Sequence, residues 1–188
     1  SFEMTSGPMR NRLGQHFLKC RWVVSTLLAA SEITKEDVVL EVGPGTGILT
    51  RALAERAGRV IAVEKDIDLA ERLRREKIPK VTIITGDILK LYSGLITNYQ
   101  LQTTRFKVVA NIPYYLTSRL VRLLLENESR PELIVLTVQK EVAQKMAANP
   151  PKMNLLALSV QVFGKPKVIK TVPAQCFSPK PRVDSAVI

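Results

Sequence analysis

The chain is poor in the residues that form metal centres and disulfide frameworks. Its 188 residues include two cysteines, Cys20 and Cys176, and one histidine, His16. The cysteines show neither a paired framework nor the spacing of metal ligands, so we expect both to be reduced thiols. A zinc site needs more cysteine or histidine ligands than this chain has, and we therefore predict no metal site.

Long apolar runs are also missing. The longest, such as residues 155–160, have the length of a strand and fall far short of the ~20 residues of a membrane span. Residues 1–9 lack the apolar segment of a signal peptide, and we interpret them as a tag or disordered leader. The rest, 46% hydrophobic and 24% charged, is typical of one globular domain, which we expect to be monomeric and cytoplasmic.

Acidic residues are few compared with basic ones. Lys and Arg number 28 against 17 Asp and Glu, which gives a net charge of +11. One basic region runs from residue 142 to the end, where Asp184 is the only acid. A second basic cluster is formed by Arg10, Arg12, Lys19 and Arg21. This excess favours a nucleic-acid partner, because neutralised phosphates release counterions. A basic protein without such a partner is the alternative, and an anionic membrane is less favoured because no basic amphipathic helix stands out.

Apolar runs alternate with helical periodicity along the chain. Strands are predicted at 38–42, 60–63, 81–85, 106–110 and 133–138, and helices at 22–30, 48–56, 68–76, 118–126 and 141–148. Residues 89–105 are compatible with a short helix and a loop. Three further segments, 156–163, 168–172 and 183–188, are predicted to close the sheet as strands. The alternation predicts an α/β domain over residues 10–188 with a doubly wound, mostly parallel sheet.

A glycine-rich turn joins the first predicted strand to the next helix. Gly43, Gly45 and Gly47 allow a tight turn and a close approach of the backbone to a ligand, toward which the helix directs its first amides. The spacing differs from the G-x-G-x-x-G dinucleotide fingerprint, which argues against a pyrophosphate ligand. A tight turn without any ligand is the alternative interpretation.

Two acids stand at the ends of the next two strands. Glu64 follows the second strand, where a carboxylate can accept hydrogen bonds from both ribose hydroxyls, and Asp87 follows the third, where it can accept from an adenine amino group. Each alone could be a solvated acid. In series they fit a nucleoside at the carboxyl edge of the sheet.

The sequence Asn111-Ile112-Pro113-Tyr114 follows the fourth strand. The Asn111 side chain and the Ile112 carbonyl could accept the two N–H bonds of an aromatic amine, Pro113 would hold the loop, and Tyr114 would stack on the base. Phe177, in a rigid basic loop, could form the other side of a base sandwich. The alternatives are a capping turn for residues 111–114 and a buried Phe177 in a surface loop.

In this order the motifs resemble the KsgA-type small-subunit rRNA adenine dimethyltransferases, over residues 12–188. The residues that carry the resemblance are Leu13–Leu18, Glu41–Gly47, Glu64, Gly86–Asp87, Asn111–Tyr114, Gln139–Val142 and Phe177–Val187.

The resemblance implies a Rossmann-like class I fold and S-adenosyl-L-methionine as the methyl donor. It also implies dimethylation at N6 of two adjacent adenosines near the 3′ end of small-subunit rRNA, bound as RNA or within a pre-ribosomal particle, and a role in small-subunit maturation. The implied transfer-site residues are Asn111, Ile112, Pro113, Tyr114 and Phe177. The implied cofactor-binding residues are Gln15, His16, Leu18, Gly43, Gly45, Gly47, Glu64, Lys65, Asp87, Ile88 and Asn111.

The chain departs from the family pattern in three ways. His16 stands where the family usually has Asn, so its contact with the cofactor is expected to be weaker or through the backbone. The usual Tyr-Gly-Arg/Lys-Leu run is missing around residues 153–156. The family's small C-terminal helical domain is absent, and because the chain stops in an apolar strand-like run we expect a truncated form.

Three other functions remain as alternatives. The nearest is an erythromycin-resistance-type methyltransferase of large-subunit rRNA, against which the ending Asp184-Ser185-Ala186-Val187 argues. The second is an rRNA-binding assembly factor with little activity, which does not need a complete 111–114 motif. A DNA adenine methyltransferase is less favoured because its motif more often has two prolines.

Overall fold

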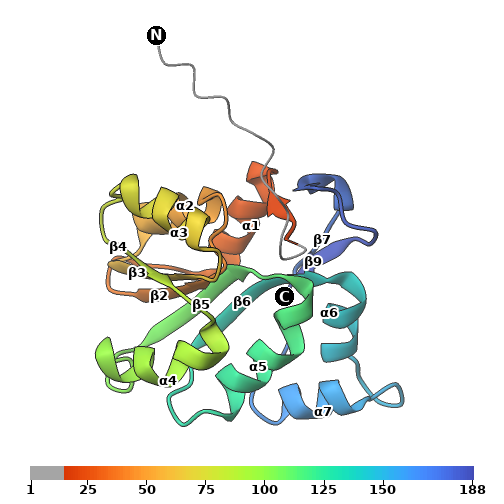
Figure 1. Ribbon diagram of the computed structural model, residues 1–188. Helices are drawn as coiled ribbons and strands as arrows, with labels where there is room; N and C mark the ends of the chain where they lie inside the picture. Colours follow the sequence, from red (N-terminus) through yellow and green to blue (C-terminus); the bar gives the residue numbers. More distant parts are fainter. Residues whose placement is uncertain (1–14) are drawn as a thin grey trace.

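A seven-stranded sheet forms the centre of the computed structural model, which describes residues 15–188. Its strand order is β4-β3-β2-β5-β6-β9-β7 (Figure 1). The first five strands in this order are parallel, β9 is antiparallel to β6, and β7 is antiparallel to β9. Their bounds are β2 Val38–Val42, β3 Arg59–Glu64, β4 Val81–Thr85, β5 Phe106–Asn111, β6 Leu133–Gln139, β7 Lys170–Val172 and β9 Ser185–Val187. The predicted mostly parallel, doubly wound sheet is confirmed.

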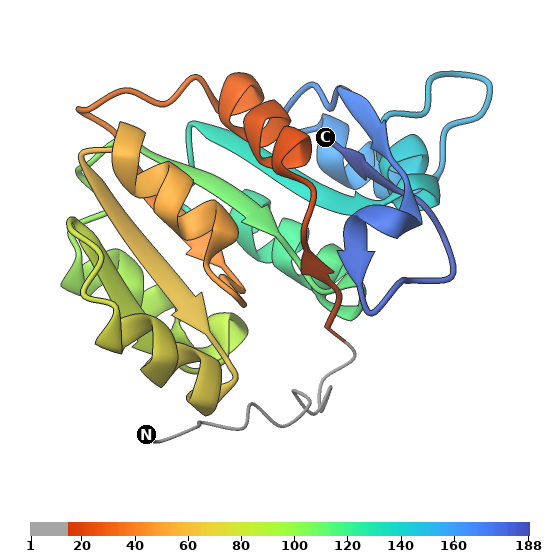
Figure 2. The same ribbon diagram turned by 90° about the horizontal axis from the view of Figure 1, so that it is seen from above.

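Helices cover both faces of this sheet (Figures 1 and 2). One face carries α1 Arg21–Ser31, α2 Ile48–Arg56 and α3 Ile67–Arg75. The other carries α4 Ile88–Asn98, α5 Thr117–Glu126, α6 Lys140–Met146 and α7 Leu155–Gln161. Consecutive strand residues such as Val108 and Val109 belong to two different core clusters, one on each face. Burial on both faces explains why the parallel strands are almost continuously apolar.

The segment predicted as a strand at 156–163 is instead the helix α7, and this prediction is wrong. A short apolar run has no period that separates a strand from a buried helix. Here the side chain of Asn154 accepts a 2.9 Å hydrogen bond from the Ala157 amide and caps the helix. Leu156 and Val160 then pack against the core on the α4–α7 side of the sheet. The segment 89–105, which the sequence left as a short helix and a loop, contains most of the helix α4 and the turns that follow it.

A second, two-stranded sheet ties the N-terminal segment to the C-terminal part of the chain. β1, Phe17–Leu18, pairs antiparallel with β8, Phe177–Ser178, and Leu18 lies opposite Phe177. Within residues 15–188, two 3-10 turns complete the elements, η1 Tyr114–Leu116 and η2 Ala174–Cys176.

The expectation of two reduced cysteines is wrong, because Cys20 and Cys176 form a disulfide with a Cα–Cα distance of 5.0 Å. The two residues are 156 positions apart in the sequence. They meet because the β1–β8 pairing brings the segments that carry them side by side, and the Lys19 amide donates to the Cys176 carbonyl at 2.9 Å. None of the helices between residues 15 and 188 combines the length and apolar character needed to cross a bilayer.

Candidate functional site

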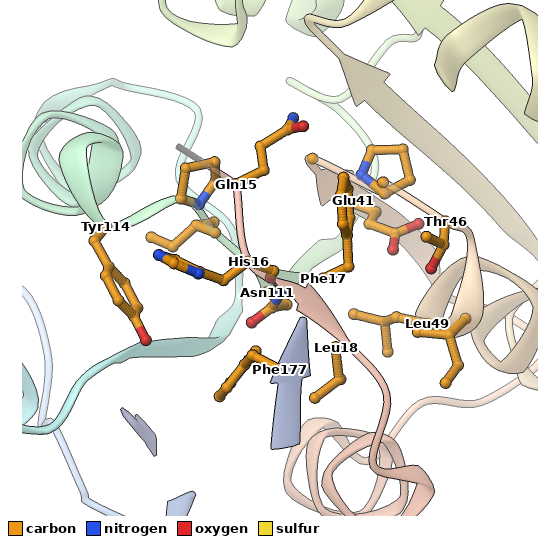
Figure 3. A pocket seen from close by; sticks show the side chains of 16 residues that line it. Gln15, His16, Phe17, Leu18, Glu41, Thr46, Leu49, Asn111, Tyr114 and Phe177 are labelled. Carbon is orange, nitrogen blue, oxygen red and sulfur yellow. Dashed lines mark hydrogen bonds between the residues drawn. The ribbon is translucent and has the colours of Figure 1, made fainter. Parts of the chain in front are cut away.

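Two adjoining cavities lie at the carboxyl edge of the parallel strands. Gln15, Gly43 and Pro113 line both of them. The first cavity, drawn in Figure 3, is also lined by these predicted site residues: His16, Leu18, Gly45, Asn111, Ile112, Tyr114 and Phe177. The second cavity is also lined by Glu64, Lys65, Asp87 and Ile88. The structure thus brings together all of the predicted site residues except Gly47, which lines neither cavity.

The glycine-rich turn requires left-handed backbone angles. The φ values are +71° at Gly43, +57° at Gly45 and +80° at Gly47, a region that L side chains rarely adopt. A Cβ atom on Gly45 would lie 3.0 Å from the ring of Phe17, and one on Gly47 would collide with Leu73. Gly45 therefore permits close packing at the first cavity, whereas Gly47 permits the packing of α2 against α3.

Glu64 is buried and holds the glycine-rich turn in place. Its carboxylate accepts hydrogen bonds of 2.9 Å from the amides of Gly45 and Asp66, and a longer one of 3.5 Å from the side chain of Gln15. Burial raises the pKa of Glu64, and the two backbone bonds act in the opposite direction. The carboxylate thus links the turn after β2, the end of β3 and the N-terminal segment.

Asp87 is the N-cap of α4 and lies at the second cavity. One carboxylate oxygen accepts from the Leu89 amide at 3.0 Å, and the other accepts from Lys65 Nζ at 3.1 Å. Partial burial acts to raise the pKa of Asp87, but the hydrogen bond from Lys65 and that from Leu89 outweigh it and lower the pKa. The carboxylate is therefore ionised at neutral pH and able to accept a further hydrogen bond.

Glu41 lines the first cavity, but the sequence predicted no role for it beyond its place at the start of the Glu41–Gly47 motif. It is 1% exposed, and its Oε2 atom has no hydrogen-bond partner within residues 15–188. Burial raises its pKa to about 8, and the nearby charge of Glu64 adds to the effect. An acid inside the apolar strand Val38–Val42 is the sequence signal that could have identified it. A buried carboxyl of this kind is suited to receive a cationic group.

Asn111 ends β5 and points into the first cavity. Its Nδ2 atom donates to the His16 carbonyl at 3.4 Å, so Oδ1 is the amide atom able to accept from a ligand. Tyr114 begins the turn η1, and its hydroxyl makes a 2.7 Å hydrogen bond with Ser185 Oγ. Burial raises the pKa of Tyr114, which keeps the hydroxyl protonated.

Phe177 lines the first cavity and is only 2% exposed (Figure 3). It packs with Leu18 in the core cluster on the α1 side of the sheet. The aromatic side chain therefore forms part of a preformed wall. Within residues 15–188, no group of three or more His, Cys, Asp or Glu side chains is arranged to hold a metal ion.

Comparison with known proteins gives consistent matches. Residues 8–188 match the family model described as "Ribosomal RNA adenine dimethylase". The ribosomal RNA small subunit methyltransferase A of Dehalococcoides mccartyi is 46% identical over 181 residues, which cover 95% of this chain and 61% of the relative. The chain thus spans about three-fifths of the length of that relative.

Solved structures agree with this match. A dimethyladenosine transferase from Plasmodium falciparum aligns with a TM-score of 0.75 and 30% identity, covering 92% of this chain and 62% of that structure. The 23S rRNA methyltransferase ErmE aligns with a TM-score of 0.74 and 29% identity, covering 91% of this chain and 67% of that structure.

Proposed function

Because this chain belongs to the ribosomal RNA adenine dimethylase family, we propose that it methylates N6 of two adjacent adenosines near the 3′ end of small-subunit rRNA. Its fold is the Rossmann-like fold of class I S-adenosyl-L-methionine-dependent methyltransferases, and S-adenosyl-L-methionine is the cofactor. The observation that carries the proposal is that the Asn111–Tyr114 segment lines a cavity directly beside a second cavity, which is lined by the acids Glu64 and Asp87.

The residues of the two cavities fit the chemistry of S-adenosyl-L-methionine. The Oε2 atom of Glu41, which has no hydrogen-bond partner within residues 15–188, would receive the α-ammonium group, which is the one cationic nitrogen of the cofactor. Glu64 would accept from the ribose hydroxyls, and Asp87 would accept from the adenine amino group. Gly43 lines both cavities and leaves the backbone accessible between them. When bound, the cofactor supplies an electrophilic methyl group.

The transfer site is formed by residues that orient an amine. Asn111 Oδ1 and the Ile112 carbonyl would accept the two N–H bonds of the adenosine N6 group, which favours a pyramidal nitrogen with its lone pair free. Tyr114 would stack on the base opposite the wall that contains Phe177. Catalysis then rests on proximity and orientation, for which the half-buried and hydrogen-bonded positions of Asn111 and Tyr114 are suited.

Small-subunit rRNA is favoured over large-subunit rRNA by the 46% identity to a relative named for the small subunit. The alignment with ErmE, a 23S rRNA methyltransferase, makes large-subunit methylation the second candidate. The net charge of +11 supports an RNA partner in either case. We further propose that the substrate is a pre-ribosomal particle and that the protein acts as a cytoplasmic monomer.

A transfer assay with labelled S-adenosyl-L-methionine tests the proposal. Unmethylated small-subunit particles, naked small-subunit rRNA and large-subunit rRNA are each incubated with the protein, and the modified bases are mapped by mass spectrometry. We expect dimethyladenosine at two adjacent positions of the small-subunit substrate. Label found only in large-subunit rRNA would favour the second candidate, and no label in any RNA would exclude both.

Two asparagine variants provide the control for the site. Asn111→Ala removes the acceptor, and we expect transfer to fall at least ~100-fold, the typical effect of losing one positioned polar group in an active site. Asn98→Ala, at the exposed end of α4, makes the same chemical change outside both cavities and should transfer like the parent protein. Equal activity of the two variants would exclude Asn111 from the transfer site.

A further inference from the structure

His16 contacts three separate parts of the candidate transfer site. Its ring nitrogen Nδ1 lies 2.7 Å from the Pro179 carbonyl oxygen, just beyond β8. Its own backbone carbonyl accepts the 3.4 Å hydrogen bond from Asn111. Its ring lies 5.5 Å from the Tyr114 ring, centroid to centroid, with the planes tilted by 35° (Figure 3). One residue thus joins the N-terminal segment to Tyr114, to the end of β5 and to the segment that follows Phe177.

The contact with Pro179 determines which ring nitrogen carries the proton. A carbonyl oxygen can only accept a hydrogen bond, so Nδ1 must be protonated and must donate. In the neutral imidazole, Nε2 then keeps a lone pair. The tautomer is therefore a consequence of the geometry that can be measured.

The contact also extends a very short sheet. β1 and β8 pair through only two residues on each strand, Phe17 with Ser178 and Leu18 with Phe177. The His16–Pro179 bond continues this pairing by one more position on both strands, using a side chain in place of the backbone. The same side chain packs against Tyr114, so it connects the segment just after Phe177 with the other aromatic residue that would enclose a base.

We propose that His16 is a positioning residue that sets the separation between Tyr114 and the Phe177 wall, and so shapes the slot for the target adenosine. Its side chain then serves the RNA substrate, in contrast to the cofactor contact implied by the family resemblance. The inference rests on the proposed function for the identity of that substrate.

The single histidine allows a direct spectroscopic test in the free protein. Nitrogen-15 NMR of the imidazole distinguishes the two tautomers through their couplings to the carbon-bound ring protons, and this chain gives one set of signals because it contains one histidine. We expect the neutral ring to be the Nδ1-protonated tautomer. A ring protonated at Nε2 would overturn the proposal, whatever the activity of the protein.

Three variants test the positioning role. Asn places its amide nitrogen the same number of bonds from Cβ as histidine Nδ1, whereas Gln places it one bond further. We therefore expect His16→Asn to remain within about twofold of the parent in kcat/KM for RNA, while His16→Gln and His16→Ala lose roughly 2- to 10-fold, the value of one net hydrogen bond. The affinity for S-adenosyl-L-methionine, measured by calorimetry, should be unchanged in all three. Ser25→Ala, exposed on α1, is the neutral control.

Contrary results would be equally clear. If Gln preserved kcat/KM for RNA as well as Asn did, or if the loss appeared in cofactor affinity, His16 would not position the RNA slot. If the parent protein methylated no rRNA, the proposed function would fall, while the tautomer would still decide whether the His16–Pro179 contact exists.

Discussion

Replacing Glu41 with Gln should make the ligand-free protein more stable at neutral pH and weaken its binding of S-adenosyl-L-methionine. Glu41 is buried at the first cavity, and its Oε2 atom has no partner in the described chain from residue 15 to 188. Gln has nearly the same shape and cannot ionise. The substitution therefore removes the carboxyl ionisation and little else.

The size of the effect follows from the pKa of the carboxyl group. Burial raises this pKa from 4.5 to about 8, so the folded protein retains the proton up to about pH 8, while the unfolded chain loses it above pH 4.5. The folded state binds more protons in this window, so stability falls as pH rises, by about 1.4 kcal/mol per pH unit at the steepest. At pH 7 the accumulated cost is ~3 kcal/mol, and at pH 5 it is below ~1 kcal/mol.

Urea unfolding at several pH values measures this slope. We expect Glu41→Gln to be more stable than the parent protein at pH 7 and nearly equal to it at pH 5. Glu55→Gln, exposed on α2, makes the same change in solvent and should follow the parent curve. If Glu41→Gln showed the pH slope of the parent protein, the buried carboxyl would not be protonated as argued.

Calorimetry addresses the second half of the prediction. A charge-assisted hydrogen bond from the cofactor ammonium to Glu41 is worth about 1.5–3 kcal/mol, so the Gln variant should bind S-adenosyl-L-methionine roughly 10- to 100-fold more weakly. Because the parent carboxyl must lose its proton to meet a cation, binding near pH 7 should release more protons from the parent than from Glu41→Gln. The difference is read from titrations in buffers of different ionisation enthalpy. Equal proton release from the parent protein and from Glu41→Gln would show that Glu41 does not contact the cofactor.

The parallel strands could be predicted from the sequence because each is a short apolar run between turn residues, and because each is also buried in the fold. Apolar runs such as Val38–Val42 and Val81–Thr85 are bounded by turn residues, and both were predicted with the bounds that the structure has. Helix α7 was mistaken for a strand because its outer face is apolar as well. Leu155 is 82% exposed and Leu158 51% exposed, so no polar stripe marks the helical period.

The sequence could predict those residues of the candidate site that lie at the ends of strands. Glu64, Asp87 and Asn111 all end or follow parallel strands, whose carboxyl ends meet at one edge of the sheet. Contacts between distant segments could not be predicted, since no local pattern encodes them. The bond between His16 and Pro179 joins residues 163 positions apart, and it depends on the two-residue pairing of β1 with β8.

Two further predictions concern stability. Gly47→Ala should destabilise the protein by at least ~1–2 kcal/mol in urea unfolding. The reason is that alanine is strained at φ +80° and that its Cβ would collide with Leu73. An unchanged unfolding midpoint would show that the α2–α3 contact relaxes freely. Reduction of the Cys20–Cys176 disulfide should cost ~2–5 kcal/mol, since it closes a loop of 156 positions. The measurement is unfolding with and without dithiothreitol, with the Cys20→Ser, Cys176→Ser double variant as the control that must not respond to the reductant. Because the disulfide lies next to the β1–β8 pair, its loss should also increase hydrogen exchange of the Leu18 and Phe177 amides before that of the central strands. Uniform exchange across the protein would show that the disulfide stabilises the whole fold and does not specifically hold this wall of the cavity.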